Sequence, residues 1–80
     1  MNEFSKLMIR HIGDLSLYQP KLYVREILLD GCTFCIEFKI RRGKFELIAA
    51  EFYNEDYEEC DSLAWKLGEI VENHYNKEIR

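Results

Sequence analysis

Long apolar runs, proline and linker-like segments are all scarce in this sequence. No segment reaches the ~18 consecutive apolar residues that a membrane-spanning helix needs, and the first residues lack the basic flank and apolar run of a secretory signal. Pro20 is the single proline, and no repeat or low-complexity stretch divides the chain. These absences predict one compact domain over residues 1–80 that does not interact with membranes.

Cysteine is present in an odd number, as Cys32, Cys35 and Cys60. Three thiols cannot complete the paired framework of a small disulfide-stabilised secreted domain. A reducing compartment is therefore expected, and we predict a cytoplasmic location. The sequence also lacks a glycine-rich phosphate loop and the H-E-x-x-H and G-x-S-x-G motifs. Because no nucleophile, base and orienting group recur at a recognisable spacing, the chain is not predicted to be an enzyme.

Positive charge is in short supply as well. The sequence has 11 Lys and Arg against 15 Asp and Glu, for a formal net charge of −4. Binding to nucleic acid through the phosphate backbone depends on clustered cations, so this balance argues against it. The apolar content is ample: 48% of the residues are hydrophobic, with five Phe and five Tyr among them. This composition is typical of a folded globular domain whose core comes from a few large side chains.

Hydrophobic periodicity predicts two helices and three strands. Apolar residues spaced at i, i+3, i+4 and i+7 indicate helices over residues 2–14 and 62–77. Strand patterns cover residues 21–29, 33–41 and 44–53, and the second of these alternates strictly between apolar and polar residues. The sequence therefore predicts an α+β fold of order α-β-β-β-α, a three-stranded antiparallel meander packed against N- and C-terminal helices.

Several local features refine this prediction. Asp30-Gly31 and Arg42-Gly43 are signals for tight turns between the strands. In the third strand, simple alternation puts three apolar residues on one face, namely Phe45, Leu47 and Ala49. The last helix is predicted to have an apolar stripe made of Leu63, Leu67, Ile70, Val71 and His74. Gly68 lies inside that helix at a cost of ~1 kcal/mol relative to Ala, which predicts a close approach of helix and sheet.

The segment from Cys32 to Cys35 is a C-x-x-C motif beside a turn, which is half of a zinc knuckle. Cys60 is a candidate third ligand, and the fourth could be His11, His74 or a carboxylate. The alternative is that Asp30-Gly31 is a two-residue turn, so that Cys32 already lies in the strand. Cys32 and Cys35 would then face opposite sides of the sheet, and one ion could not bind both. A structural zinc site and ordinary half-buried cysteines are both open at this point.

Acidic residues are concentrated between the third strand and the last helix. Six acids and no base occur from Glu51 to Asp61, and two tyrosines lie among them. Tyrosine supplies contact area at protein interfaces, and the acids complement a basic partner surface. The predicted partner-binding residues are Tyr53, Glu55, Asp56, Tyr57, Glu58 and Glu59. The alternative is a solvated loop whose charges stabilise the start of the last helix.

The opposite end of the predicted sheet is basic, because Lys39, Arg41, Arg42 and Lys44 surround the second turn. These cations could contact phosphate directly. Alternatively, they keep the hairpin soluble and discourage aggregation through strand edges. A three-stranded sheet has two edges to protect, so a homodimer is also compatible with the sequence.

The predicted element order resembles that of double-stranded-RNA-binding domains. Pro20-Lys21-Leu22-Tyr23, Gly31 and Phe34 follow the first two strands of that family loosely. Those domains contact phosphates through a basic cluster at the start of the last helix. Here that place reads Glu58-Glu59-Cys60-Asp61-Ser62. Since the charge is reversed, the resemblance implies the fold but not RNA binding.

In size, acidity and tyrosine content the chain is similar to small phage-encoded inhibitors, anti-CRISPR proteins among them. This resemblance implies an inhibitor, active in the cytoplasm of a bacterial host, that binds a larger protein. The expected docking site is a basic, nucleic-acid-binding surface such as the channel of a CRISPR effector nuclease.

Overall fold

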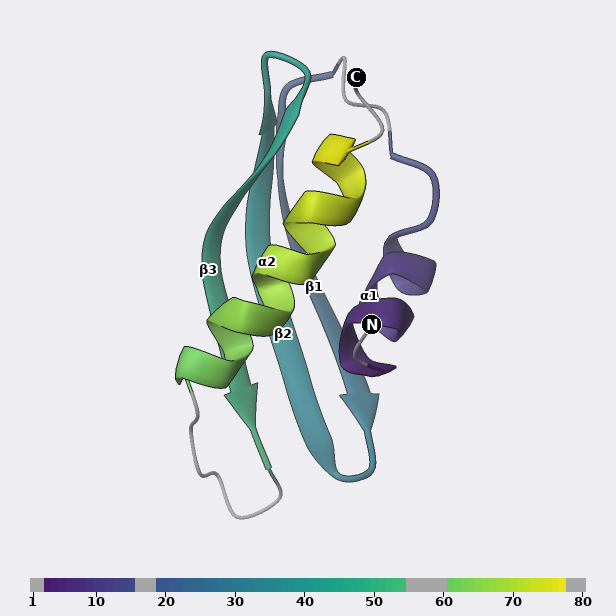
Figure 1. Ribbon diagram of the computed structural model, residues 1–80, viewed down its shortest axis with the longest axis vertical. Helices are drawn as coiled ribbons and strands as arrows, with labels where there is room; N and C mark the ends of the chain where they lie inside the picture. Colours follow the sequence, from purple (N-terminus) through teal and green to yellow (C-terminus); the bar gives the residue numbers. More distant parts are fainter. Residues whose placement is uncertain (1–2, 16–18, 55–60, 78–80) are drawn as a thin grey trace.

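The predicted α-β-β-β-α order is confirmed. The computed structural model describes residues 3–15, 19–54 and 61–77, and Figure 1 shows how the elements are arranged. Its elements are α1 (Glu3–Ile12), β1 (Lys21–Leu29), β2 (Cys32–Arg41), β3 (Lys44–Tyr53) and α2 (Asp61–Lys77). The three strands form one antiparallel sheet in the order β1-β2-β3.

Two-residue turns join the strands, as the sequence predicted. Asp30 and Gly31 have φ angles of 52° and 74°, and Arg42 and Gly43 have φ angles of 54° and 74°. Positive φ at both central positions matches the right-handed twist of the flanking strands. The first turn places Cys32 at the start of β2, where it pairs with Leu29.

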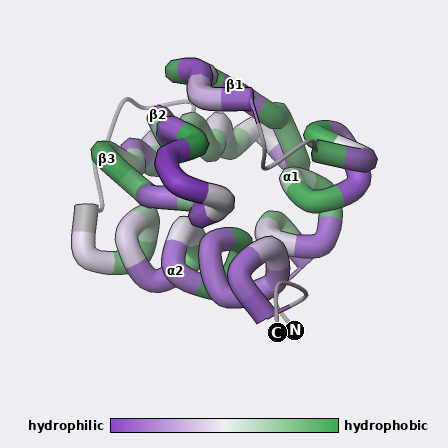
Figure 2. The backbone as a smooth tube through the Cα atoms, turned by 90° about the horizontal axis from the view of Figure 1, so that it is seen from above, coloured by the Kyte–Doolittle hydropathy of each residue, from purple (hydrophilic) through white to green (hydrophobic). Residues whose placement is uncertain are grey.

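The core lies between the sheet and the two helices, which occupy the same side of the sheet in Figure 2. Its centre is the inward row of β2, where four side chains are at most 2% exposed: Phe34, Ile36, Phe38 and Ile40. Met8 of α1 is also fully buried. Ser5 joins the two helices, because its buried hydroxyl donates a hydrogen bond to the carbonyl oxygen of Leu67 at 3.0 Å.

Four aromatic rings connect the edge of the sheet to the last helix. Tyr23, Phe38, Phe45 and Tyr75 stack in sequence, with centroids 5.1, 4.1 and 5.3 Å apart. The hydroxyl of Tyr75 donates to the carbonyl oxygen of Gly13 at 2.8 Å. This bond fixes the end of α1 against the last turns of α2 and satisfies a polar group that the stack would otherwise bury unpaired.

A β-bulge in β3 overturns the predicted alternation of that strand. Phe38 of β2 pairs with Leu47, whereas Glu37 pairs with Ala49, so Ile48 is an extra residue without a partner. The extra residue changes the face on which the following side chains lie. Ala49 is therefore exposed with Ile48 and does not join Phe45 and Leu47 in the core, while Ala50 packs against the core.

The buried stripe of α2 also differs from the prediction. Leu67 and Val71 are buried as expected, but Leu63 is 38% exposed and Ala64 is fully buried. The reason is the close approach at Gly68, where an added Cβ would lie 2.8 Å from a methyl carbon of Leu47. Small residues therefore face β3, and the stripe runs through Ala64, Leu67, Gly68, Val71 and Tyr75.

The β3 edge of the sheet is capped by side chains of α2. On β3, the side-chain amide of Asn76 accepts a hydrogen bond from the N–H of Phe45 at 2.8 Å and donates one to its carbonyl oxygen at 2.9 Å. The carboxylate of Glu72 accepts from the N–H of Leu47 at 2.7 Å. Side chains of α2 thus replace a fourth strand along this edge.

Candidate functional site

The side of the sheet opposite the helices, called the open face below, is the main candidate for a binding site. Strand register sets its composition, because directly paired residues share a face. Its cross-strand rows are Leu22–Lys39–Glu46, Val24–Glu37–Ala49, Glu26–Cys35–Glu51 and Leu28–Thr33–Tyr53, with Ile48 added by the bulge.

Large apolar side chains are exposed on the open face. Leu22, Val24 and Leu28 of β1 are 58%, 54% and 71% exposed, and Ile48 of β3 is 39% exposed. Single exposed apolar residues are common, but several on one sheet face mark a surface suited to contact with another protein.

Three carboxylates surround the centre of the open face. Glu26 and Glu51 lie directly across from Cys35 on the two neighbouring strands, and Glu37 follows two residues later on β2. Burial raises the pKa of the Cys35 thiol, and the charges of Glu26, Glu51 and Glu37 raise it further. The thiol therefore remains protonated at neutral pH, which disfavours a role as nucleophile or metal ligand.

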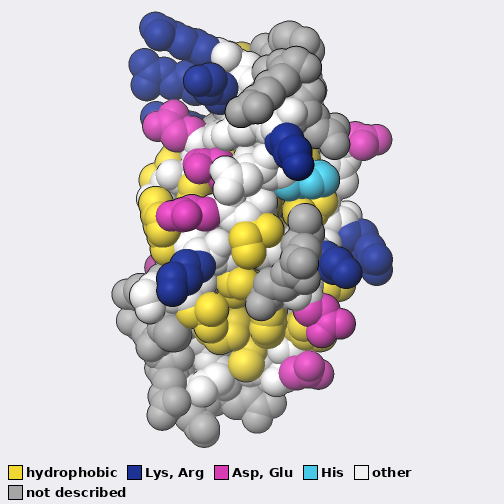
Figure 3. Space-filling model, in the orientation of Figure 1, with side chains coloured by type: hydrophobic (Ala, Val, Ile, Leu, Met, Phe, Trp, Pro, Cys, Tyr) yellow, Lys and Arg dark blue, Asp and Glu magenta, His cyan; other side chains and the backbone are white. Residues whose placement is uncertain are grey.

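The other end of the sheet carries the basic residues. Lys39, Arg41, Arg42 and Lys44 lie at or next to the β2–β3 turn, and Figure 3 shows Lys and Arg side chains gathered over this hairpin. Lys21, which pairs with Ile40, starts β1 at the same end. The sheet is therefore polarised along its strands, from an acidic and apolar region to a basic hairpin.

The predicted acidic site lies mostly outside the described residues. Tyr53 is the last residue of β3, where it is half-buried and pairs with Thr33 on the open face. The remaining predicted contacts fall outside the described residues and stay predictions: Glu55, Asp56, Tyr57, Glu58 and Glu59. The carboxylates that the structure does bring together, Glu26, Glu37 and Glu51, were not singled out from the sequence as one group.

The strand geometry separates the two cysteines of the C-x-x-C motif. Cys32 and Cys35 are both in β2 and both have free, half-buried thiols. Because they are three residues apart on a strand, their side chains point to opposite faces. Within residues 3–15, 19–54 and 61–77, no group of three or more His, Cys, Asp and Glu side chains could hold a metal ion. A zinc site that uses Cys60 remains a prediction, since that residue lies outside these ranges.

The two histidines occupy different environments. His11 is exposed near the end of α1, whereas His74 of α2 is half-buried and packs edge-on against the ring of Tyr75 at 5.1 Å. The ring contact gives His74 a packing role. His11 instead lines an open recess between α1 and β1, together with Leu7, Arg10, Glu26, Ile27 and Leu28.

Sequence reasoning did not identify the open face or the recess beside α1 as candidate binding surfaces. The available signal was β1 itself, because apolar residues occupy both odd and even positions of this strand and so lie on both faces, as in Ile27-Leu28-Leu29. A strand that is apolar on both faces is normally covered on both faces. Here the helices cover one face only.

Comparisons with known proteins do not place the chain in a family. No family model matches the sequence, and neither a curated protein nor a solved structure shows significant similarity to it. None of the described helices combines the length and apolar character that crossing a membrane requires.

Proposed function

We propose that this chain is a protein-binding module without enzymatic activity, which inhibits or adapts a larger protein by docking its open face on a basic surface. The observation that carries the proposal is the coincidence of three carboxylates, Glu26, Glu37 and Glu51, with exposed apolar side chains on one sheet face. Apolar contact supplies affinity, and the carboxylates select and orient a basic partner.

A nucleic-acid-binding surface is the partner chemistry that fits best. Such surfaces concentrate Lys and Arg to neutralise phosphates, so a protein that covers them must itself be acidic. The chain has a net charge of −4, and its acidic segment follows β3 directly in the sequence. By resemblance to small phage-encoded inhibitors, we propose the channel of a CRISPR effector nuclease in a bacterial cytoplasm as the target.

The test is binding to a panel of purified CRISPR effector nucleases at low and high salt, together with inhibition of DNA cleavage. Binding to at least one nuclease is expected, and it should weaken as salt screens the charges. The triple variant Glu26→Lys, Glu37→Lys, Glu51→Lys should lose about tenfold or more in affinity, because three attractive contacts become repulsive.

A matched control reverses the same number of charges elsewhere. Glu3, Asp14 and Glu69 are exposed and lie on or beside the helices. The variant Glu3→Lys, Asp14→Lys, Glu69→Lys changes the net charge equally but leaves the open face intact, so it should still bind. The proposal is wrong if no nuclease binds at micromolar protein in low salt, or if both triple variants lose affinity to the same extent.

A further inference from the structure

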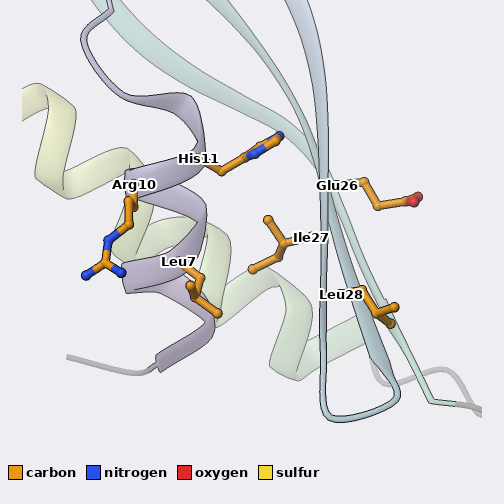
Figure 4. A pocket seen from close by; sticks show the side chains of 6 residues that line it. All are labelled: Leu7, Arg10, His11, Glu26, Ile27 and Leu28. Atoms are coloured by element: carbon orange, nitrogen blue, oxygen red, sulfur yellow. The ribbon is translucent and has the colours of Figure 1, made fainter.

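The open face carries charges of both signs, and they are separated along the strands. Counting from the β2–β3 turn, its first four cross-strand rows are Arg41–Lys44, Leu22–Lys39–Glu46, Val24–Glu37–Ala49 and Glu26–Cys35–Glu51. The cations of these rows lie in the first two, whereas the last two contain three carboxylates and no cation. In Figure 4, Glu26 points away from α1 and Ile27 points toward it, which places the even-numbered residues of β1 on this face.

A second copy of the chain, turned end over end, complements this charge pattern. Consider a two-fold axis that runs across the strands, between the row of Lys39 and the row of Glu37. It sets each strand against its own counterpart, so Lys39 faces Glu37 of the second copy and Lys44 faces Glu51. An axis along the strands would instead set each row against itself, cation against cation and acid against acid. The charges therefore select the first orientation.

Apolar side chains lie where this axis passes. Leu22 would face Val24 of the second copy, and the bulge residue Ile48, which lies between Glu46 and Ala49, would meet its own counterpart. Leu22, Val24 and Ile48 are between 39% and 58% exposed in the single chain, so all three have surface to bury. An apolar centre with charged pairs around it is the usual anatomy of a specific protein interface.

The size of the contact indicates how strong such a pairing is. At the usual strand spacings, four overlapping rows of three strands bury on the order of 1,000 Å² in total, which is the lower limit for a specific interface. Two twisted sheets packed face to face also cross at about 30°, so the pairs nearest the axis fit best. Those pairs are the two formed by Glu37 and Lys39. A weak dimer whose orientation depends mainly on these two residues is therefore expected.

We propose that the chain forms a weak two-fold dimer in which the open faces of two copies pack together with their strands antiparallel. Apolar contact among Leu22, Val24 and Ile48 supplies affinity, and the reciprocal pairs of Glu37 with Lys39 set the orientation. The dimer itself does not require any other partner. Its consequence for binding rests on the proposed function: the dimer covers the face that docks on a basic protein, so the two associations compete.

The test is sedimentation velocity of the full chain from micromolar to millimolar concentration. The wild-type chain should dimerise within this range, and Glu37→Lys and Lys39→Glu should each weaken the dimer at least about tenfold, because two attractive pairs become repulsive. An equimolar mixture of the two variants should form a heterodimer, since every cation of one then faces a carboxylate of the other. Both variants stay acidic overall, so general attraction cannot produce that result. Lys66→Glu, at an exposed position of α2, is the matched control and should dimerise as wild type does.

The position of the axis is tested with a second pair of variants. Ile48→Ser should weaken the dimer, whereas Leu28→Ser should not, because the row of Leu28 lies beyond the overlap although this side chain is 71% exposed.

The inference is overturned if the wild-type chain stays monomeric up to millimolar concentration, if the mixed variants form no heterodimer, or if Lys66→Glu weakens the dimer as much as Lys39→Glu does. Dimerisation is measured without a nuclease, so its failure is distinguishable from a failure of the proposed function. Lys39→Glu provides the link between the two: it should bind a nuclease at least as tightly as the wild-type chain, because it removes both the competing dimer and a cation from the docking face.

Discussion

The hydrogen bonds between Asn76 and the edge of β3 allow a direct measurement of how much a side-chain cap contributes to the free energy of unfolding. Replacing Asn76 by Ala removes both hydrogen bonds between its amide and the backbone of Phe45, at 2.8 and 2.9 Å. The β2–β3 ladder itself is untouched, because the cap lies on the opposite side of the strand. The change therefore tests the edge cap separately from the sheet.

The magnitude follows from two opposing terms. Two net hydrogen bonds of about 0.5–1.5 kcal/mol each predict a loss of about 1–3 kcal/mol in the free energy of unfolding. Alanine is a better helix former than asparagine by about 0.5 kcal/mol, which offsets part of the loss. Asn73 is the matched control, since it is exposed in the same helix and makes no such bond. Asn73→Ala should stabilise by a few tenths of a kcal/mol, so the two variants should differ by about 2 kcal/mol.

Urea unfolding followed by circular dichroism is the assay, with the midpoint and the m-value fitted for each variant. An unchanged m-value with a lower midpoint for Asn76→Ala would show a change in stability and not in the unfolded state. If Asn76→Ala and Asn73→Ala agree within a few tenths of a kcal/mol, the amide does not stabilise the edge. The contrast with the edge of β1, which no described side chain of α2 caps, would then lose its basis.

Two further predictions concern α2. Burial, and to a lesser extent the charge of Asp14, raises the pKa of Tyr75 from its ordinary value of 10 to about 12. The unfolded chain then ionises first, so stability should fall as pH rises from 10 to about 12. Tyr75→Phe should flatten that dependence in pH-resolved urea titrations; an unchanged slope would contradict it. Gly68→Val should lower the unfolding free energy by about 2 kcal/mol through overpacking against Leu47, measured by thermal melting. A melting temperature equal to wild type would refute the close contact.

Local rules were sufficient for the elements and their order. Strict alternation in residues 33–41 indicated a strand with one buried face. The two turn signals indicated antiparallel pairing between strands that follow each other in the sequence. Both turns adopt positive φ, as Asp30-Gly31 and Arg42-Gly43 predicted. These features depend on contacts between residues close in sequence, so they could be predicted without tertiary information.

The binding surfaces were less predictable, because they join residues from different strands. Glu26, Glu37 and Glu51 are distant in sequence and become neighbours only through the ladder register. The acidic run after Tyr53 could be recognised from the sequence, because its charges lie close together along the chain. The recess beside α1 likewise depends on how far a helix lies from an edge strand, which periodicity does not report.

The sequence by itself determined the fold class, the two tight turns, the inward row of β2 and the need for a small residue at position 68. Tertiary structure decided which residues of β3 and α2 are buried. The bulge at Ile48 moved Ala49 out of the core, and the contact of Gly68 with Leu47 moved Leu63 toward solvent. Tertiary structure also decided that side chains of α2 cap the edge of β3, whereas α2 caps no backbone group of β1 among the described residues. The physical reason is packing. One extra residue in a strand, or one missing side chain in a helix, changes which residues of that element face the core, and this choice depends on contacts with other elements that the local sequence does not contain.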